Sequence, residues 1–247
     1  MPPFLQDGGS FGESGPALQI DSFMVRVAAF RSRALSFFST DSPALPTSTA
    51  DLSAIANTGK ELDDDLTKWA SSVPEEWKAK RTHVESSRGD DGDALYSDLC
   101  NTYTSHGHAS LWLRHRALRL IINSIFIKFI DVRMQTGVDT DHLLWKQNRM
   151  RGNLISISTD LCEDVPYFFS YPSAQKSPRV GGNEERFTHA ILPKLAALLA
   201  WPLAIAVSTE NVPEPQRQWL QRKLKVAADC LGDSVLESVA ERGEFRF

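Results

Sequence analysis

The stretch LWLRHRALRLIINSIFIKFI, residues 111–130, decides the fold. Apolar side chains recur along it at the spacing of one helical face, namely Leu111, Leu118, Ile122, Ile125 and Phe129. Further apolar side chains fill the other faces, namely Leu120, Ile121, Ile127 and Ile130. A helix that is apolar on all sides must be surrounded by other elements. The stretch therefore predicts a central helix inside a packed bundle.

Helical spacing continues on both sides of this stretch. It predicts helices over residues 17–38, 60–72, 94–134, 141–165, 187–208, 213–232 and 233–242. We expect an interruption at Gly107, and kinks or breaks at Pro193 and Pro202. No segment alternates between apolar and polar residues as a half-buried strand would. The expected fold is all-α, an irregular bundle of about six to eight helices around one core.

The length of 247 residues suits one large domain. Residues 1–16 lack a basic region followed by an apolar stretch, so they predict a disordered leader and not a secretory signal. Residues 17–247 are expected to form a single all-α domain with mobile loops at about 39–50, 83–93 and 170–186. The longest apolar run, residues 195–207, is shorter than the roughly 20 residues that span a bilayer. It predicts a buried helix, and no membrane contact is expected.

Charge and cysteine content limit the class of protein. A net charge of −4 gives no overall attraction to phosphate backbones, so direct DNA binding by this chain is not expected. Cys100, Cys162 and Cys230 lie far apart and form no C-x-x-C pair. They predict neither a disulfide framework nor a thiolate zinc site, which suits a reducing intracellular compartment.

Three histidines lie before or within the apolar stretch and raise the question of a metal site: His106, His108 and His115. Residues two apart point to nearly opposite sides of a helix, and residues seven apart lie about two turns from each other. Zinc sites on helices use spacings of three or four. The histidines are therefore interpreted as polar residues at the start of a buried helix, and no metal ligand is predicted.

A run of carboxylates, Asp63, Asp64 and Asp65, suggests an alternative function. Aspartate-rich helices in all-α isoprenoid enzymes hold Mg²⁺ against a diphosphate, which requires several oxygen ligands and nearby basic residues. A second acidic cluster, Asp90, Asp91 and Asp93, lies in a predicted linker. The simpler interpretation is that carboxylates near a helix start are favoured by the helix dipole. The enzyme remains the alternative.

Other catalytic and binding patterns are weak. No serine lies in a G-x-S-x-G turn, and no cysteine has a histidine at a suggestive position. A basic cluster near the C-terminus is interpreted as the solvated side of a helix that packs Trp219, Leu220 and Leu224 inward; its members are Arg217, Arg222, Lys223 and Lys225. The sequence thus predicts no catalytic, cofactor-binding or metal-binding residues and no cofactor.

Several phrases, taken in order, resemble one family. LDDDLTKWASSVPEEW carries the first match, through Leu62, Leu66, Trp69, Pro74 and Trp77. YTSHGHASLWLRHRALR carries the second, through Tyr103, Trp112, Arg116 and Arg119. The arginines here are three apart, whereas those of the family are four apart. VPY and WPL carry the next two, through Val165, Pro166, Tyr167, Trp201, Pro202 and Leu203. QRQWLQRKLKVAADCLGDSVLESVAE then resembles the closing helices of the family. From about residue 20 to residue 240, the chain resembles the fungal-specific transcription factor regulatory domain, the C-terminal part of fungal zinc-cluster transcription factors.

The resemblance implies an all-α, non-catalytic regulatory domain in the nucleus. It implies protein partners from the transcription machinery or a DNA-binding subunit, and it leaves a small-molecule effector and a homodimer open. The six closely spaced cysteines of the family's zinc cluster are not found in this sequence. We further expect Trp112 to be buried and to anchor the packing of the central helix.

Overall fold

The computed structural model describes residues 15–38, 49–83, 95–135, 140–169 and 191–244. The predicted all-α class is confirmed, since these residues form seven α-helices and a single two-stranded sheet. The helices are α1 (Gly15–Phe38), α2 (Thr49–Ser72), α3 (His106–Gln135), α4 (Thr140–Asp164), α5 (Pro193–Val207), α6 (Glu214–Leu231) and α7 (Ser234–Arg242). Two 3-10 helices, η3 (Glu75–Trp77) and η4 (Val165–Phe168), follow α2 and α4.

The chain groups into two compact units. Unit 1 draws on Met1–Glu75, Arg114–Ser158 and Thr209–Pro213, and unit 2 on Glu76–Leu113, Thr159–Ser208 and Glu214–Phe247. The unit boundaries fall inside α3 and α4, so each of these helices supplies residues to both units. Apart from a few residues at their edges, the predicted leader and the three predicted mobile loops lie outside the described residues.

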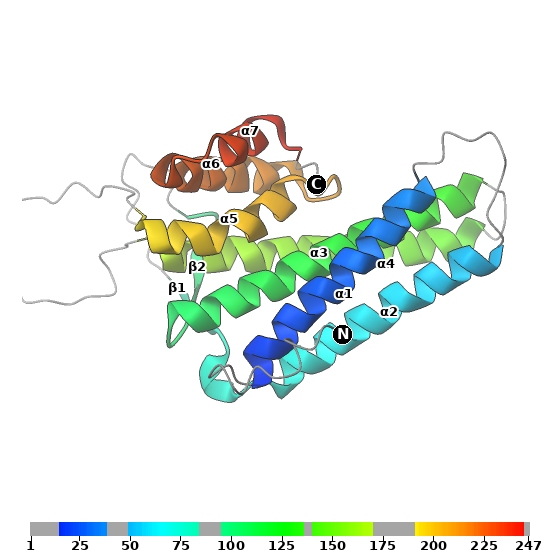
Figure 1. Ribbon diagram of the computed structural model, residues 1–247, viewed down its shortest axis with the longest axis horizontal. Coiled ribbons are helices and arrows are strands. Elements are labelled where there is room, and N and C mark those ends of the chain that lie inside the picture. The colour runs from blue at the N-terminus through cyan, green and yellow to red at the C-terminus, as the bar shows by residue number, and fades with distance from the viewer. Residues whose placement is uncertain (1–14, 39–48, 84–94, 136–139, 170–190, 245–247) are drawn as a thin grey trace, which may run out of the picture. The chain divides into compact units, whose positions relative to one another are not determined.

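In unit 1, α1 packs against α2 (Figure 1). On α1 the buried side chains lie three or four residues apart, which places them on one face: Ile20, Phe23, Val27, Phe30 and Ala34. On α2, Leu62, Leu66 and Trp69 are buried at the four- and three-residue spacing of one face. Helix α2 ends at Ser72 as expected, because Pro74 disfavours helical geometry in the residue before it. The unit is thus built on regular amphipathic pairing.

The central stripe of α3 is also confirmed. Leu111, Leu118, Ile122, Ile125 and Phe129 are all buried, and so are Leu120, Ile127 and Ile130 from the other faces. The helix begins at His106, so Gly107 lies in its first turn and does not interrupt it. Trp112 is only half-buried, whereas we expected it to be buried.

Gly59, in the middle of α2, allows a close approach between helices. A Cβ added there would lie 2.7 Å from Cζ of Phe30 and 3.0 Å from Cζ of Phe126. Phe30 is only 2% exposed, so its ring has little space to move aside. We expect Gly59→Ala to lower the free energy of unfolding by about 1–3 kcal/mol, because overpacking outweighs the helical preference of alanine.

Gly152, in α4, is the matched control for Gly59. Apart from its chain neighbours and the backbone of its own helix, a Cβ there would meet no atom of the described residues within 4 Å. Gly152→Ala should therefore raise the free energy of unfolding by about 0.5–1 kcal/mol. Urea denaturation of both variants measures the difference, and equal shifts of the same sign would contradict the close packing at Gly59.

Two predictions between η3 and α3 were wrong. Strand β1 (Lys80–His83) pairs antiparallel with β2 (Leu99–Thr102), with Arg81 opposite Asn101, although no strand was expected. Residues 95–105, predicted as helical, contain no helix. The cause is local, because cysteine, asparagine and threonine are weak helix formers and the Ser97 hydroxyl accepts a hydrogen bond from the Leu99 amide at 3.3 Å. The Asn101 side chain also donates a hydrogen bond to Asp164.

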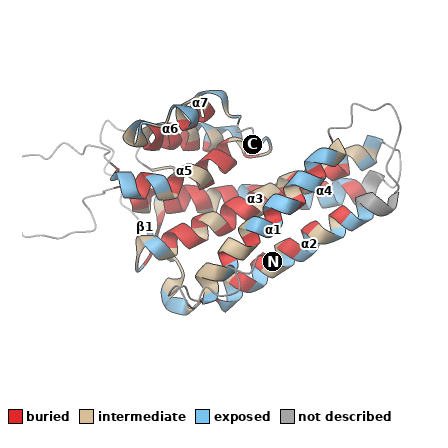
Figure 2. Cartoon of the chain, viewed as in Figure 1, coloured by how far each residue is buried: buried red, intermediate tan, exposed pale blue. Residues whose placement is uncertain are grey.

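In unit 2, α5 packs against α6 and α7 (Figure 1), and most of α5 is buried (Figure 2). Pro193 occupies the first turn, where its missing N–H is not needed, so α5 starts there. The helix continues through Pro202 and is not broken by it. Asp233 caps α7 by accepting hydrogen bonds from the amides of Val235 and Leu236. No helix among the described residues is long and apolar enough to cross a membrane.

Candidate functional site

His106 and His108 each lie in a separate aromatic contact in unit 2. The His106 ring centroid is 4.8 Å from that of Tyr167. The His108 ring stacks on Trp77 with centroids 4.4 Å apart, and its Nδ1 is 2.7 Å from the Thr104 hydroxyl. In the part of the chain that the structure describes, no group of three or more His, Cys, Asp or Glu residues could hold a metal ion.

His115 is buried in unit 1. Its ring stacks on Trp69 with centroids 5.2 Å apart, and Nε2 lies 3.2 Å from the Leu66 carbonyl oxygen. Because a carbonyl can only accept, Nε2 carries the proton and donates it. Burial lowers the pKa of His115 to about 3, and the positive charges of Arg116 and Arg119 add to this effect. His115 is therefore a neutral structural side chain at physiological pH.

This burial predicts an acid-sensitive stability. In the unfolded chain the histidine binds a proton below its ordinary pKa of about 6.5, whereas in the folded chain it stays neutral down to about 3. The unfolded state thus binds more protons in this window. The contribution of neutral His115 to the free energy of unfolding is therefore fully present above about pH 6.5, and it is lost as the pH drops toward 3. Between about pH 7.5 and about pH 5.5 we expect a loss of about 1 kcal/mol.

Chemical denaturation at the two pH values measures this loss. The His115→Gln variant should lack that part of the pH dependence, whereas His142→Gln, which changes an exposed side chain, should keep it. An unchanged pH dependence in His115→Gln would contradict the assignment.

The three aspartates of α2 have different surroundings. Asp63 accepts two hydrogen bonds from the Arg119 guanidinium, at 2.8 and 3.2 Å. Asp65 pairs with Arg26 at 2.9 Å and lies 3.6 Å from the Lys68 ammonium. Asp64 is exposed. Two of the three carboxylates are thus engaged by cations of the chain itself.

A groove of about 440 Å³ runs between α1 and α2, and we call it the α1–α2 groove. Its lining consists of Leu18, Gln19, Ser22, Phe23, Arg26, Asp65, Lys68, Trp69 and Ser72. Asp65 is the one carboxylate in this lining, whereas a Mg²⁺–diphosphate site needs several oxygen ligands. Asp65 is paired with both Arg26 and Lys68, so the lining carries one net positive charge beside Phe23 and Trp69. This combination better suits a small amphipathic molecule with an anionic group. The groove is the candidate effector site, and no sequence pattern pointed to it.

A buried polar cluster in unit 2 was also missed, and we call it the Asp164 cluster. Asp164 is fully buried at the end of α4, and it accepts hydrogen bonds from the Tyr103 hydroxyl at 2.7 Å and the Asn101 amide at 2.9 Å. The Tyr167 hydroxyl donates to the Tyr103 carbonyl at 2.8 Å. Next to it, Glu163 pairs with Arg81 at 2.5 Å. The cluster ties β2, α4 and η4 together.

The thiols near this cluster are held in the protonated form. Burial raises the pKa of Cys100 to about 11, and the charges of Asp164 and Glu163 act in the same direction. The pKa of Cys162 is raised by the same causes. All three cysteines are free, and these two are buried, so they are structural and not nucleophilic.

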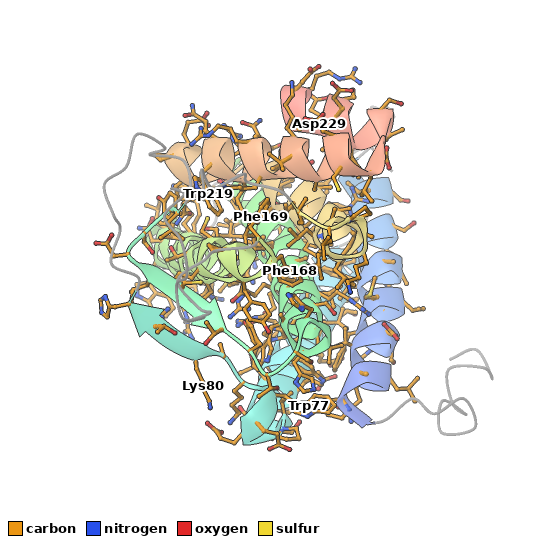
Figure 3. All side chains as sticks on the ribbon, turned by 90° about the vertical axis from the view of Figure 1, so that its left-hand side faces the viewer. Trp77, Lys80, Phe168, Phe169, Trp219 and Asp229 are labelled. Carbon is orange, nitrogen blue, oxygen red and sulfur yellow. The ribbon has the colours of Figure 1, made fainter. Side chains whose placement is uncertain are left out.

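The interpretation of the basic cluster on α6 was wrong for Lys223. Trp219, Leu220 and Leu224 are buried as expected, but Lys223 is only 3% exposed. Its Nζ lies 5.2 Å from the ring centroids of both Phe169 and Trp219, which lie close together in Figure 3. Because Lys223 follows Trp219 by four residues, the two share a helical face, and cation–π attraction stabilises the ammonium there.

Comparison of the chain with protein-family models, with curated proteins and with solved structures gives no match.

Proposed function

We propose that the chain is a non-catalytic regulatory domain that modulates transcription in the nucleus through effector or protein contacts. Its partners would be the transcription machinery or a DNA-binding subunit. The chain itself would not bind DNA directly, since its net charge is −4. The α1–α2 groove would take the effector.

One observation carries this proposal: three of the phrases that resemble the fungal-specific transcription factor regulatory domain contact one another. In unit 2, the Trp112 indole donates a hydrogen bond to the Trp77 carbonyl at 2.8 Å. The rings of Tyr103 and Tyr167 meet edge to face with their centroids 5.6 Å apart. In unit 1, Arg119 forms its two bonds with Asp63. In a non-catalytic regulatory domain, the residues of the signature would stabilise the fold, and such residues are expected to contact one another.

The alternative, an all-α enzyme that uses Asp63–Asp65 with Mg²⁺, is less well supported. Asp63 is bound by Arg119, and the groove beside Asp65 supplies cations where further carboxylates would be needed. We therefore do not assign catalytic, cofactor-binding or metal-binding residues.

A reporter assay tests the proposal. The 247-residue chain is fused to an unrelated DNA-binding domain, and reporter output is compared with that of the DNA-binding domain alone at equal nuclear abundance. We expect output to change in one direction or the other. Mg²⁺-dependent turnover of an allylic diphosphate by the purified chain would favour the enzyme instead.

A further inference from the structure

One face of α4 in unit 1 exposes large apolar side chains. Trp145 is 59% exposed, Ile155 is 48% exposed and Leu144 is 39% exposed. Residues 144 and 155 are eleven apart, which is close to three helical turns, so Leu144 and Ile155 lie along one line of the helix. Contiguous exposed apolar side chains mark interaction sites more often than scattered ones do.

Cations flank this apolar strip. Arg149 and Arg151 are both exposed, and because residues two apart point to nearly opposite sides of a helix, they lie on its two edges. Residues 142–159 contain no aspartate or glutamate. The Arg149 guanidinium carbon lies 5.7 Å from the centroid of the Trp145 ring. We call this surface the Trp145 face, and define it by Leu144, Trp145, Arg149, Arg151, Gly152 and Ile155.

Gly152 gives a second, independent observation. It lies seven residues after Trp145 and three before Ile155, so it falls on the same face between them. Glycine inside a helix is less favourable than alanine, and a Cβ at Gly152 would meet no atom of the described residues within 4 Å outside its own helix. Nothing in the described interior therefore requires glycine there. A glycine on an exposed helix face instead leaves room for an incoming side chain to approach the backbone.

We propose that the Trp145 face docks an acidic segment of a partner protein that carries bulky apolar side chains. The apolar residues would lie over Gly152 between Trp145 and Ile155, and the carboxylates would pair with Arg149 and Arg151. Tryptophan and arginine are the residues most often found at the energetic centre of interfaces. The proposal is independent of the proposed function, because it rests on the exposed side chains alone.

Charge complementarity selects this occupant. In a two-fold contact between copies, the same surface would meet itself, so the cations of one copy would meet a surface that carries cations and no carboxylate. A nucleic acid could stack on Trp145, but it would find only Arg149 and Arg151 as cations on this face of a chain of net charge −4, and Leu144 and Ile155 offer no surface for base stacking. An acidic, apolar segment satisfies both the charged and the apolar side chains of the face.

Fluorescence anisotropy with the full chain tests the proposal. The probe is a labelled 16-residue peptide with leucine and phenylalanine at helical three- and four-residue spacing and aspartate or glutamate elsewhere. We expect saturable binding that Trp145→Ala and Arg149→Glu each weaken by about ten-fold or more. Gly152→Gln should weaken binding by at least about five-fold while its melting temperature stays equal or rises, which a loss of folding could not produce.

Matched controls complete the test. Val235→Ala changes a side chain of α7 that is 63% exposed, and it should leave binding unchanged. A peptide with lysine in place of each acidic residue should not bind. The proposal is overturned if the acidic peptide does not bind or if the variants bind it equally well. It is also overturned if an oligonucleotide displaces the peptide with higher affinity, or if the chain self-associates and Trp145→Ala abolishes that association.

Discussion

Asp164→Ala is expected to lower the free energy of unfolding by about 3–5 kcal/mol. The carboxylate is fully buried, and it accepts hydrogen bonds from the Tyr103 hydroxyl and the Asn101 amide. Removing it takes this acceptor from two buried donors, and each such loss costs about 1–3 kcal/mol. The Asp164 cluster should therefore be among the most sensitive sites of unit 2.

Denaturant titration followed by circular dichroism measures this loss. The control is Asp160→Ala, one turn earlier on α4, where the side chain is 39% exposed and pairs with Arg81 at 3.3 Å. A surface pair of this kind contributes about 0–1 kcal/mol. If both variants lost the same stability, the structural role of Asp164 would be wrong.

Trp69→Ala should cost about 3–5 kcal/mol, which is the usual range for truncating a buried tryptophan. Trp69 is 3% exposed, stacks on His115, and donates from Nε1 to the Pro16 carbonyl at 3.0 Å. Its loss would leave a cavity between α2 and α3 in unit 1 and release the start of α1.

Trp112→Ala is the matched comparison in unit 2. Trp112 is half-buried, so less apolar area returns to water, and we expect a loss of about 1–3 kcal/mol. Thermal or chemical unfolding of the two variants ranks them. A larger loss for Trp112 than for Trp69 would contradict the observed burial, and would restore Trp112 as the main anchor.

The helices could be predicted because their signals are local. The stripe of α3, from Leu111 to Phe129, follows from a spacing that any buried helix must show. The ends of α6 and α7 follow from Pro213, Gly232 and Asp233, whose effects on the backbone act over a few residues.

The misses have a different physical origin. Asn101 and Asp164 are 63 residues apart, so their hydrogen bond depends on the tertiary fold, and it helps to hold β2 where helical spacing was expected. Lys223 was placed in solvent because of its charge, although its position four residues after Trp219 already put it on the buried face. Trp112 was expected to be buried because of its size, but its indole N–H lies at the edge of the core and bonds to the Trp77 carbonyl.

The candidate sites divide in the same way between local signals and features that depend on the tertiary fold. The interpretation of His106, His108 and His115 as residues without a shared metal was made from spacing, and the structure places each in its own aromatic contact. The α1–α2 groove could not be predicted, because it is formed by residues of two helices, such as Phe23 and Trp69, that also face the core.

The most direct test of the central claim is reporter output from the tethered chain, measured for the wild type and for Asp164→Ala at equal nuclear abundance. We expect the wild type to change output by about three-fold or more. Asp164→Ala, which loses about 3–5 kcal/mol, should return output toward that of the DNA-binding domain alone. Output that the folded, abundant wild-type chain leaves unchanged would contradict a role in transcription.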